Sequence, residues 1–512
     1  MADELQYPPT LWEFVRQRAA ATPDQVVLGD EAGRRVTVAE FRDAAERMAA
    51  GLYADGIGPG TVVSWQLPTT IDTLVLLAAL ARLGAVQCPI IPILREREVR
   101  YITDEAHTEV LIVRPQWRGF DYEAFARGIA DEVGFRVMAT DTFPTGDPTT
   151  LPEPPGPEAA ARWLYYTSGS TADPKGAWHT DAALMAAGNT WLSKMQPQAT
   201  DIYPVAFPVG HIGGASMLVV TLMSGMCMIV VEAFDAERSP LFMAEQGATL
   251  LGTAVPFFRA YLAAQAKHGS EKLFPNLRAC VGGGAPTPPA LHEDVKRELG
   301  GIGIIGSWGL TEFPIATCGA VTDTDEQIAT SEGTAGPGVE VRVVGLDGLE
   351  KGPGEEGELR LRGPQMFLGY ANPSLNDGAL DEQGYFHTGD LGIVTDTGHV
   401  LITGRVKDII IRNAENISAS EIEDALHLHP KIADVGVIAL PDPKTGERAC
   451  AVVKLADGVD SLTLVEIGDH CRELGLARQK VPEQLEIVDE VPRNAMGKIQ
   501  KPELRKRFAP TP

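Results

Sequence analysis

Cysteine and positive charge are both scarce in this chain. Its six cysteines are scattered and form no Cys-x-x-Cys pair, so the sequence indicates neither a zinc site nor a disulfide framework, and we expect reduced thiols. Asp and Glu number 69 against 44 Lys and Arg, a formal net charge of -25. A surface of that sign repels the phosphates of nucleic acids and anionic membranes, which argues against a nucleic-acid partner. One basic patch, which could meet a small polyanion, consists of Lys498, Lys501, Arg505, Lys506 and Arg507.

Signals for export or membrane insertion are also lacking. The first ten residues, MADELQYPPT, have neither the basic nor the apolar region of a secretory signal. Residues 215–231 are almost free of charge, but Ser224-Gly225 interrupts them and a β-rich run follows. This pattern favours a helix, a tight turn and a buried strand over a membrane span. We therefore expect a cytoplasmic protein without a transmembrane segment.

The chain is long enough for several packed cores, with 512 residues of which 44% are hydrophobic. Helical patterns that end at glycine alternate with β-rich runs, which predicts layered α/β subdomains. After Gly333 short strands with Gly/Pro turns indicate a β-rich subdomain. A break at 404–408 precedes about a hundred residues, enough for a small α+β domain. We predict an α/β multidomain protein with a large N-terminal domain, 1–404, and a small mobile C-terminal domain, 405–512.

The most informative segment runs from Tyr165 to Gly176, YYTSGSTADPKG. A β-rich approach leads into hydroxyl and glycine residues and then Lys175. Backbone N–H groups, hydroxyls and an ammonium in one loop can bind a polyphosphate. The segment does not match the Walker A pattern. A flexible Ser/Gly linker is the alternative, but a linker seldom lies between a hydrophobic strand and Pro-Lys-Gly.

A second glycine-rich segment, Gly301 to Gly306 (GIGIIG), matches the dinucleotide pattern G-x-G-x-x-G. That pattern should follow a strand and begin a helix. Here it follows a helical run and enters a strand-like stretch, so we interpret it as a chance match.

Several further segments occur in order: FPVGHIGG (207–214), CVGGGAP (280–286), SWGLTE (307–312), YFHTGDL (385–391), GRVKD (404–408), NAENISASEIE (413–423) and PRNAMGKIQK (492–501). With the loop at 165–176 they resemble the adenylate-forming superfamily of acyl-CoA synthetases, peptide-synthetase adenylation domains and luciferases. The resemblance covers nearly the whole chain. One departure is Ala172, which stands where the family's phosphate loop usually has a glycine. It bears on the turn geometry of the loop, because alanine tolerates positive φ poorly.

The resemblance implies a role for each matched residue. The nucleotide site would consist of Thr167, Ser168, Gly169, Ser170, Thr171, Lys175, Gly283, Gly284, Ala285, Pro286, Trp308, Asp390 and Arg405. The acyl pocket would consist of His211, Gly213, Gly214, Gly282 and Trp308. Catalytic roles would fall to Lys498, Thr311, Glu312 and His211. Within these sets Asp390 would bind the ribose, Thr311 the phosphate, Glu312 the Mg²⁺ ion, and Lys498 the carboxylate and α-phosphate.

The C-terminal motifs imply a moving domain. Lys407 lies at the position about which relatives rotate the C-terminal domain between two half-reactions. Asn413 and Ala414 lie where relatives border the tunnel for the pantetheine arm of coenzyme A. They replace two glycines that are common at this place in the family. Because the tunnel admits the thiol, this replacement affects the prediction of thiol transfer more than that of adenylation.

The activity implied is that of an AMP-forming acid:CoA ligase. ATP and a carboxylic acid would give acyl-AMP and pyrophosphate, and the acyl group would then pass to coenzyme A. The glycines of the pocket suggest a medium-chain, alicyclic or aromatic acid, as in bacterial fatty-acid or cyclohexanecarboxylate:CoA ligases. Mg²⁺ would be the metal, and dimers are frequent among relatives.

Two alternatives stay open. One is a stand-alone adenylating enzyme that loads the phosphopantetheine thiol of a carrier protein. The other belongs to a different class, a non-catalytic nucleotide-binding module. The joint presence of Thr311, Glu312, Asp390, Arg405 and Lys498 disfavours the second.

Overall fold

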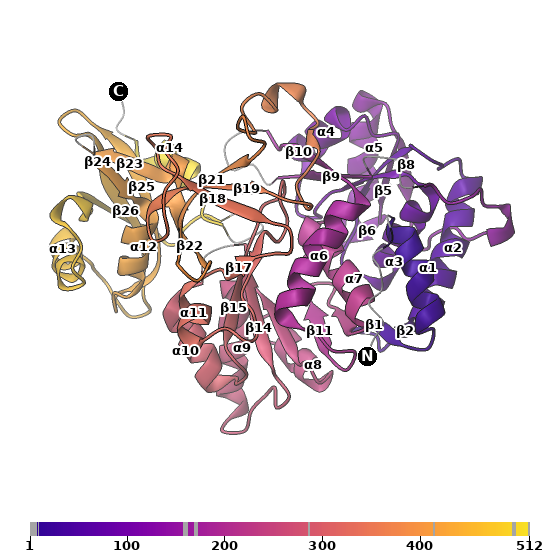
Figure 1. The fold of residues 1–512 in the computed structure, drawn as a ribbon, viewed down its shortest axis with the longest axis horizontal. Coiled ribbons are helices and arrows are strands. Elements are labelled where there is room, and N and C mark those ends of the chain that lie inside the picture. The colour runs from indigo at the N-terminus through magenta and orange to yellow at the C-terminus, as the bar shows by residue number, and fades with distance from the viewer. Residues whose placement is uncertain are drawn as a thin grey trace.

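The computed structural model describes residues 8, 10–156, 162–167, 173–284, 287–412, 415–493 and 498–509. Figure 1 shows a larger body, which holds the N-terminal and central parts of the chain, and a smaller C-terminal part at one end of it. The predicted fold class is confirmed: layered α/β units and a β-rich unit precede a small α+β unit.

Two mostly parallel sheets begin the larger body. The seven-stranded sheet has the order β20-β10-β9-β4-β3-β5-β8, and the four-stranded sheet has the order β11-β12-β1-β2. The strands of the first are β3 (Val62–Gln66), β4 (Val86–Pro89), β5 (Val110–Val113), β8 (Arg136–Ala139), β9 (Trp163–Tyr166), β10 (Gly176–His179) and β20 (Gly369–Tyr370). Those of the second are β1 (Val26–Asp30), β2 (Arg35–Thr37), β11 (Ile202–Val205) and β12 (Cys227–Val230). A small hairpin comprises β6 (Gln116–Trp117) and β7 (Phe120–Asp121).

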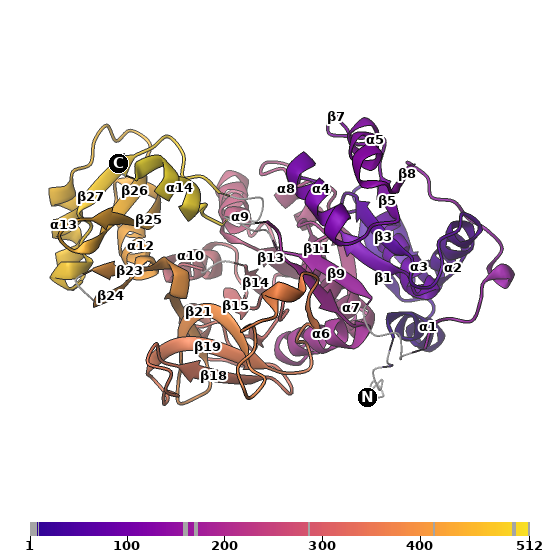
Figure 2. The same ribbon diagram turned by 90° about the horizontal axis from the view of Figure 1, so that it is seen from above.

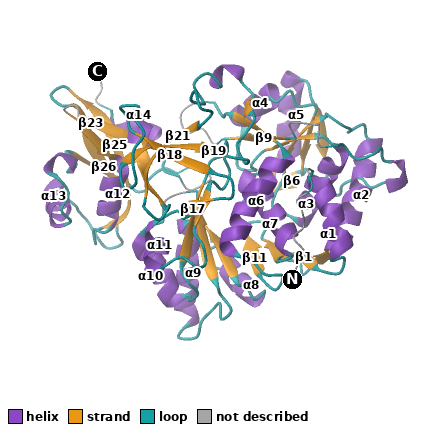
Figure 3. Ribbon diagram, viewed as in Figure 1, coloured by secondary structure: helices purple, strands orange, loops and turns teal. Residues whose placement is uncertain are grey.

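Helices pack around and between these two sheets (Figure 3). They are α1 (Leu11–Ala21), α2 (Val38–Ala54), α3 (Ile71–Leu83), α4 (Glu96–Glu105), α5 (Tyr122–Val133), α6 (Asp181–Met195) and α7 (Ile212–Ser224). Helices α3 and α7 are apolar on nearly every side because both lie inside one large core. Each ends at a left-handed glycine, Gly84 or Gly225, and a strand follows, as the sequence predicted. In the part of the chain that the structure describes, no helix has both the length and the apolar composition to cross a membrane.

A third sheet has the order β13-β14-β15-β16-β17. Its strands are β13 (Leu250–Thr253), β14 (Ala279–Gly283), β15 (Ile304–Trp308), β16 (Thr317–Cys318) and β17 (Thr334–Ala335). Its helices are α8 (Ser239–Glu245), α9 (Val255–His268), α10 (Pro289–Glu298) and α11 (Asp325–Thr330). The GIGIIG segment connects the end of α10 to β15, so it lies in the opposite context to a dinucleotide motif, and its interpretation as a chance match is confirmed.

The β-rich unit is an antiparallel sheet of β18 (Glu340–Val344), β19 (Glu356–Arg362), β21 (Phe386–Val394) and β22 (Val400–Arg405). A short 3-10 helix at Val406–Asp408 connects β22 to the C-terminal sheet, which Figure 2 shows beside it. That sheet contains β23 (Ile409–Arg412), β24 (Glu415–Ser418), β25 (Ile432–Asp442), β26 (Gly446–Leu455) and β27 (Gln484–Ile487). Its helices are α12 (Ala419–His427), α13 (Leu464–Glu473) and α14 (Lys501–Phe508).

Candidate active site

Asp390 is the centre of the first cluster of predicted site residues. Strands β21 and β22 place Asp390 opposite Arg405 in antiparallel register, and the Arg405 Nε donates to Asp390 Oδ1. The indole Nε1 of Trp308, at the end of β15, donates to Asp390 Oδ2 at 2.9 Å. The carboxylate is 6% exposed, so these charge-assisted bonds hold it in one orientation. Three residues distant in the sequence thus form one polar group where two sheets meet.

Glu312 is the centre of the second cluster. Its carboxylate is buried, and the hydroxyl of Tyr370 donates to its Oε1 at 2.7 Å. Burial, followed by the charge of Glu312, raises the pKa of Tyr370 far above its ordinary value, so the phenol remains a donor. The Lys175 Nζ lies 5.4 Å from the centre of the Tyr370 ring, a cation–π distance. Tyr370 therefore connects the predicted metal ligand to the predicted phosphate-binding lysine.

The neighbouring residue Thr311 is positioned by its backbone. His179 Nε2 donates to the Thr311 carbonyl at 2.8 Å. Burial lowers the pKa of His179 to about 4, so the ring is neutral at physiological pH. This bond uses the carbonyl and does not occupy the Thr311 hydroxyl, which the sequence assigned to phosphate.

Lys498 comes from the C-terminal part and reaches both clusters. Lys498 is an exposed residue, although nearby protein groups desolvate its ammonium. This desolvation, and then the positive charge of Arg405, lower the pKa of Lys498, whereas Asp390 and Glu312 raise it. Lysine, arginine and two carboxylates therefore lie within electrostatic reach of one another. The two cations of this group could form charge-assisted hydrogen bonds to an anionic ligand.

His211 is also within electrostatic reach of Lys498. It is the N-cap residue of α7, where its Nδ1 accepts the Gly213 N–H at 3.1 Å. Because Nδ1 is an acceptor, the proton of the neutral ring is on Nε2. Burial, and then the charge of Lys498, lower the pKa of His211 to about 4. The ring therefore offers a neutral N–H donor close to an ammonium.

The predicted glycines differ in what lies next to their Cα atoms, where a side chain would otherwise be. A Cβ at Gly214 would collide with the backbone of Val209, so this glycine allows α7 to pack. A Cβ at Gly282 would lie 2.9 Å from both Ile304 Cγ2 and Thr287 Oγ1. Gly284 has φ +79° and open space beside it. The space next to Gly214 and Gly282 thus holds protein atoms, while that next to Gly284 is open.

Nine predicted positions lie outside the described residues: Ser168, Gly169, Ser170, Thr171, Ala172, Ala285, Pro286, Asn413 and Ala414. At the edge of the phosphate loop, the Thr167 N–H donates to the Lys175 carbonyl at 3.0 Å and the Lys175 N–H donates to Thr167 Oγ1 at 3.3 Å. These bonds close the base of the loop and keep its two ends together. Lys407 lies in the 3-10 helix between β22 and β23.

Sequence reasoning missed three residues of this region. Neither Tyr370 nor His179 stands in a motif that indicates a site. Glu332 is the third: its Oε2 lies 2.7 Å from the point where a Cβ on Gly306 would stand, and burial raises its pKa to about 7. Only tertiary structure places Tyr370 beside Glu312 and Lys175, His179 beside Thr311, and Glu332 beside Gly306.

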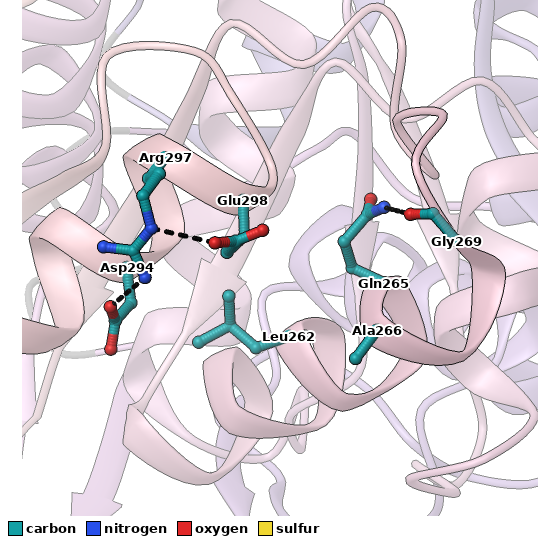
Figure 4. Close-up of a pocket in the computed structure, with 7 residues that line it drawn as sticks. All are labelled: Leu262, Gln265, Ala266, Gly269, Asp294, Arg297 and Glu298. Atoms are coloured by element: carbon teal, nitrogen blue, oxygen red, sulfur yellow. Dashed lines mark hydrogen bonds and ion pairs between the residues drawn. The ribbon is translucent and has the colours of Figure 1, made fainter.

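A surface depression between α9 and α10 lies elsewhere (Figure 4). Its polar groups already pair with one another: Arg297 donates to Asp294 at 2.5 Å and to Glu298 at 2.8 Å, and Gln265 donates to the Gly269 carbonyl at 3.0 Å. None of the predicted site residues lines it. We therefore place the candidate site at the converging clusters and not at this depression.

Comparison with known proteins identifies the family of the chain. The family model for "AMP-binding enzyme" matches residues 15–371, and that for "AMP-binding enzyme C-terminal domain" matches residues 421–498. The medium-chain fatty-acid–CoA ligase of Escherichia coli (strain K12) is 30% identical over 522 residues, which cover 97% of this chain and 90% of that protein. The salicyl-AMP ligase / salicyl-S-ArCP synthetase of Mycobacterium tuberculosis (strain ATCC 25618 / H37Rv) is 31% identical, with 96% and 89% covered. The crystal structure of ATP-bound MatB from Rhodopseudomonas palustris superposes with a TM-score of 0.89 at 26% identity, covering 98% of this chain and 99% of that one.

The fold and the family matches define an enzyme of the adenylate-forming class. The chain belongs to the AMP-binding enzyme family, and its relatives include acyl-CoA ligases. The resemblance found in the sequence motifs is thereby confirmed.

Proposed function

We propose that this protein is an acid:CoA ligase that forms an acyl-adenylate from ATP and then transfers the acyl group to coenzyme A. The observation that carries the proposal is the position of Lys498. This lysine of the C-terminal part lies within electrostatic reach of Asp390, Arg405 and Glu312, and its charge also acts on His211. An ammonium within electrostatic reach of both the Asp390 and Arg405 pair and the neutral donor His211 could bring a substrate carboxylate to the α-phosphate.

The first half-reaction needs no protein nucleophile. Asp390 would accept hydrogen bonds from the ribose hydroxyls, and Lys175 and the Thr311 hydroxyl would bind phosphate oxygens. The Nε2–H of His211 would donate to one oxygen of the substrate carboxylate. The other oxygen attacks the α-phosphorus, the bond from that phosphorus to the β-phosphate oxygen breaks, and pyrophosphate leaves.

Lys498 would act mainly in the transition state. Negative charge accumulates on the α-phosphate as the new bond forms, and a positioned ammonium stabilises that charge more than it stabilises the bound substrates. Since desolvation strengthens such an interaction, the crowded surroundings of Lys498 favour the role.

Glu312 fits a Mg²⁺ ion. Among the described residues, Tyr370 bonds to Oε1, which leaves Oε2 as the oxygen that could face a cation, and Mg²⁺ prefers carboxylate oxygen. When bound, the ion would neutralise charge on the phosphates. Tyr370 and the buried backbone around Glu312 would hold the carboxylate in place.

The second half-reaction would follow rotation of the C-terminal part about Lys407, with the domain boundary at 404/405. Rotation would withdraw Lys498 and admit a thiol. The thiolate sulfur attacks the acyl carbon, a thioester forms and AMP leaves. Coenzyme A is the thiol we propose, because the relatives named above include a CoA ligase. A carrier-protein thiol is the second candidate, since another relative is named a salicyl-S-ArCP synthetase.

We further propose a medium-chain, alicyclic or aromatic acid as the substrate. A neutral His211 offers no charge that would pair with a second ionic group on the acid, and aliphatic or aromatic tails carry no such group. The six cysteines are free, which is consistent with action in the reducing cytoplasm.

The test measures pyrophosphate release and loss of the CoA thiol from purified protein, ATP, Mg²⁺ and CoA, with a panel of fatty, alicyclic and aromatic acids. Both signals with one acid are expected. Pyrophosphate without thiol loss would favour the carrier-protein enzyme, which a phosphopantetheinylated carrier would then test. If ATP binds but neither signal appears with any acid, the non-catalytic module replaces the proposal.

A further inference from the structure

A histidine away from the nucleotide clusters is held in a fixed orientation by the fold. His292, on α10, is 1% exposed. Its Nδ1 lies 3.1 Å from both the N–H and the carbonyl oxygen of Ile304. Gly303 faces the ring, and a Cβ there would lie within 2.9 Å of Nε2. The imidazole therefore cannot rotate, and its other nitrogen points in one direction only.

That other nitrogen, Nε2, is buried and has no hydrogen-bond partner among the described residues. It points toward Asp325, whose Oδ1 lies 3.6 Å away, beyond hydrogen-bond distance. A buried polar atom without a partner destabilises the folded state. This destabilisation disappears if a ligand occupies the space between this nitrogen and the carboxylate.

Two carboxylates complete a cluster around this space. One nitrogen of His292 and one oxygen each of Glu293 and Asp325 lie within 4.8 Å of one another. Both acidic side chains are exposed, so they can rotate to shorten these distances, and water can fill the remaining coordination positions. The three residues come from α10 and from the first position of α11, so a ligand there would join the two helices.

We propose that His292, Glu293 and Asp325 form a binding site for a divalent transition-metal ion of the Zn²⁺ type. One imidazole nitrogen with two carboxylates is a donor set for Zn²⁺, whereas Mg²⁺ prefers oxygen alone. While Nδ1 accepts the Ile304 N–H, the proton of the neutral ring is on Nε2. Metal binding at Nε2 would move that proton to Nδ1, where the Ile304 carbonyl can accept it, and such a bond is the usual outer contact of a metal-binding histidine. The site is separate from Glu312, whose side-chain partners among the described residues, Tyr370 and Lys498, supply no imidazole.

Lys296 is the competitor for this site. Its ammonium pairs with Asp325 Oδ1, and this bond more than any other influence lowers the pKa of Asp325. A metal ion would have to displace the ammonium, so removal of Lys296 should strengthen binding. Arg297, in contrast, pairs with Asp294 and Glu298 (Figure 4) and is not at the cluster.

The experiment titrates full-length, chelator-treated protein with Zn²⁺ in the presence of excess Mg²⁺, by calorimetry, and with Co²⁺ as an absorbing probe. Wild type should bind one ion that Mg²⁺ does not displace. Glu293→Gln and Asp325→Asn should weaken binding at least about tenfold, and Lys296→Gln should tighten it. Glu326→Gln is the matched control, since Glu326 is an exposed neighbour of Asp325, and it should bind as wild type does.

Other histidines could also bind Zn²⁺, in particular His429 and His470, whose ring centres are 4.8 Å apart. Binding there would be insensitive to Glu293→Gln and Lys296→Gln. Equal affinity in wild type and these two variants would therefore overturn the proposal, as would the lack of any binding by wild type. Because Glu293 and Lys296 lie at the surface, their variants are expected to fold, which thermal unfolding without metal verifies.

Discussion

The indole N–H of Trp308 donates to the carboxylate of Asp390 at 2.9 Å, and so connects β15 of one sheet to β21 of another. The Arg405 guanidinium bonds to the other oxygen of the same carboxylate. The nucleotide cluster therefore depends on how these sheets pack against each other.

Lys498→Ala should slow pyrophosphate release with ATP and acid about a hundredfold or more, because it removes a positive charge placed to stabilise the transition state. Single-turnover kinetics measures this step. Lys506→Ala, at an exposed position of α14, should leave the rate unchanged. Thioester formation from a supplied acyl-adenylate should also survive in Lys498→Ala. Equal loss in both half-reactions would contradict the assigned role.

Tyr370→Phe should raise the Mg²⁺ concentration needed for half-maximal pyrophosphate release several-fold. The lost hydroxyl holds Glu312 Oε1, and one such bond contributes about 1–2 kcal/mol. Tyr385→Phe is the control, because its hydroxyl donates to Glu340 in the β-rich unit. If both variants need the same Mg²⁺ concentration, Tyr370 does not support the metal site.

His179→Gln should reduce the acid sensitivity of the fold. The pKa of His179 is about 4 in the folded chain and 6.5 in the unfolded one, so the unfolded state gains the proton first as the pH falls. The free energy of unfolding of wild type should therefore drop from pH 7 to pH 5 by about 2 kcal/mol more than that of the variant. Denaturant unfolding at the two pH values measures the difference. The exposed His268→Gln should behave as wild type does.

Glu332→Gln should stabilise the protein at pH 8. Burial raises the pKa of Glu332 from 4.5 to about 7, so the folded state resists ionisation and wild type loses stability as the pH rises from 4.5 to 7. The gain should be roughly 1–3 kcal/mol at pH 8 and close to zero at pH 4. Thermal unfolding across this range checks it. A gain that does not change with pH would point to packing instead of charge.

Much of the fold could be predicted because its signals are local. Helices that end at Gly84 and Gly225 and the strands that follow them depend on nearby residues only. The register that places Asp390 opposite Arg405 was not predicted, although both residues were identified from motifs. Sequence patterns indicate which residues serve a site, and pairing between distant strands decides their geometry.

The partners of Glu312 and Thr311 could not be predicted. Tyr370 belongs to β20, which pairs with β10 at the edge of the seven-stranded sheet, and His179 ends β10. Their positions follow from tertiary packing of sequence-distant segments. A tyrosine or a histidine at the end of a short strand carries no local signal for such a role.

Arg405 is the last residue of β22, and Lys407 follows within two positions in the connecting 3-10 helix. The proposed ribose-binding residues, Asp390 and Arg405, thus precede the proposed pivot, Lys407, in the chain, whereas Lys498 comes after it. If the C-terminal part turns, an adenylate intermediate would stay tethered by its ribose while its acyl end becomes uncovered. Residues before the pivot would then retain the labile intermediate, while movement of the residues after it would give access to the second substrate.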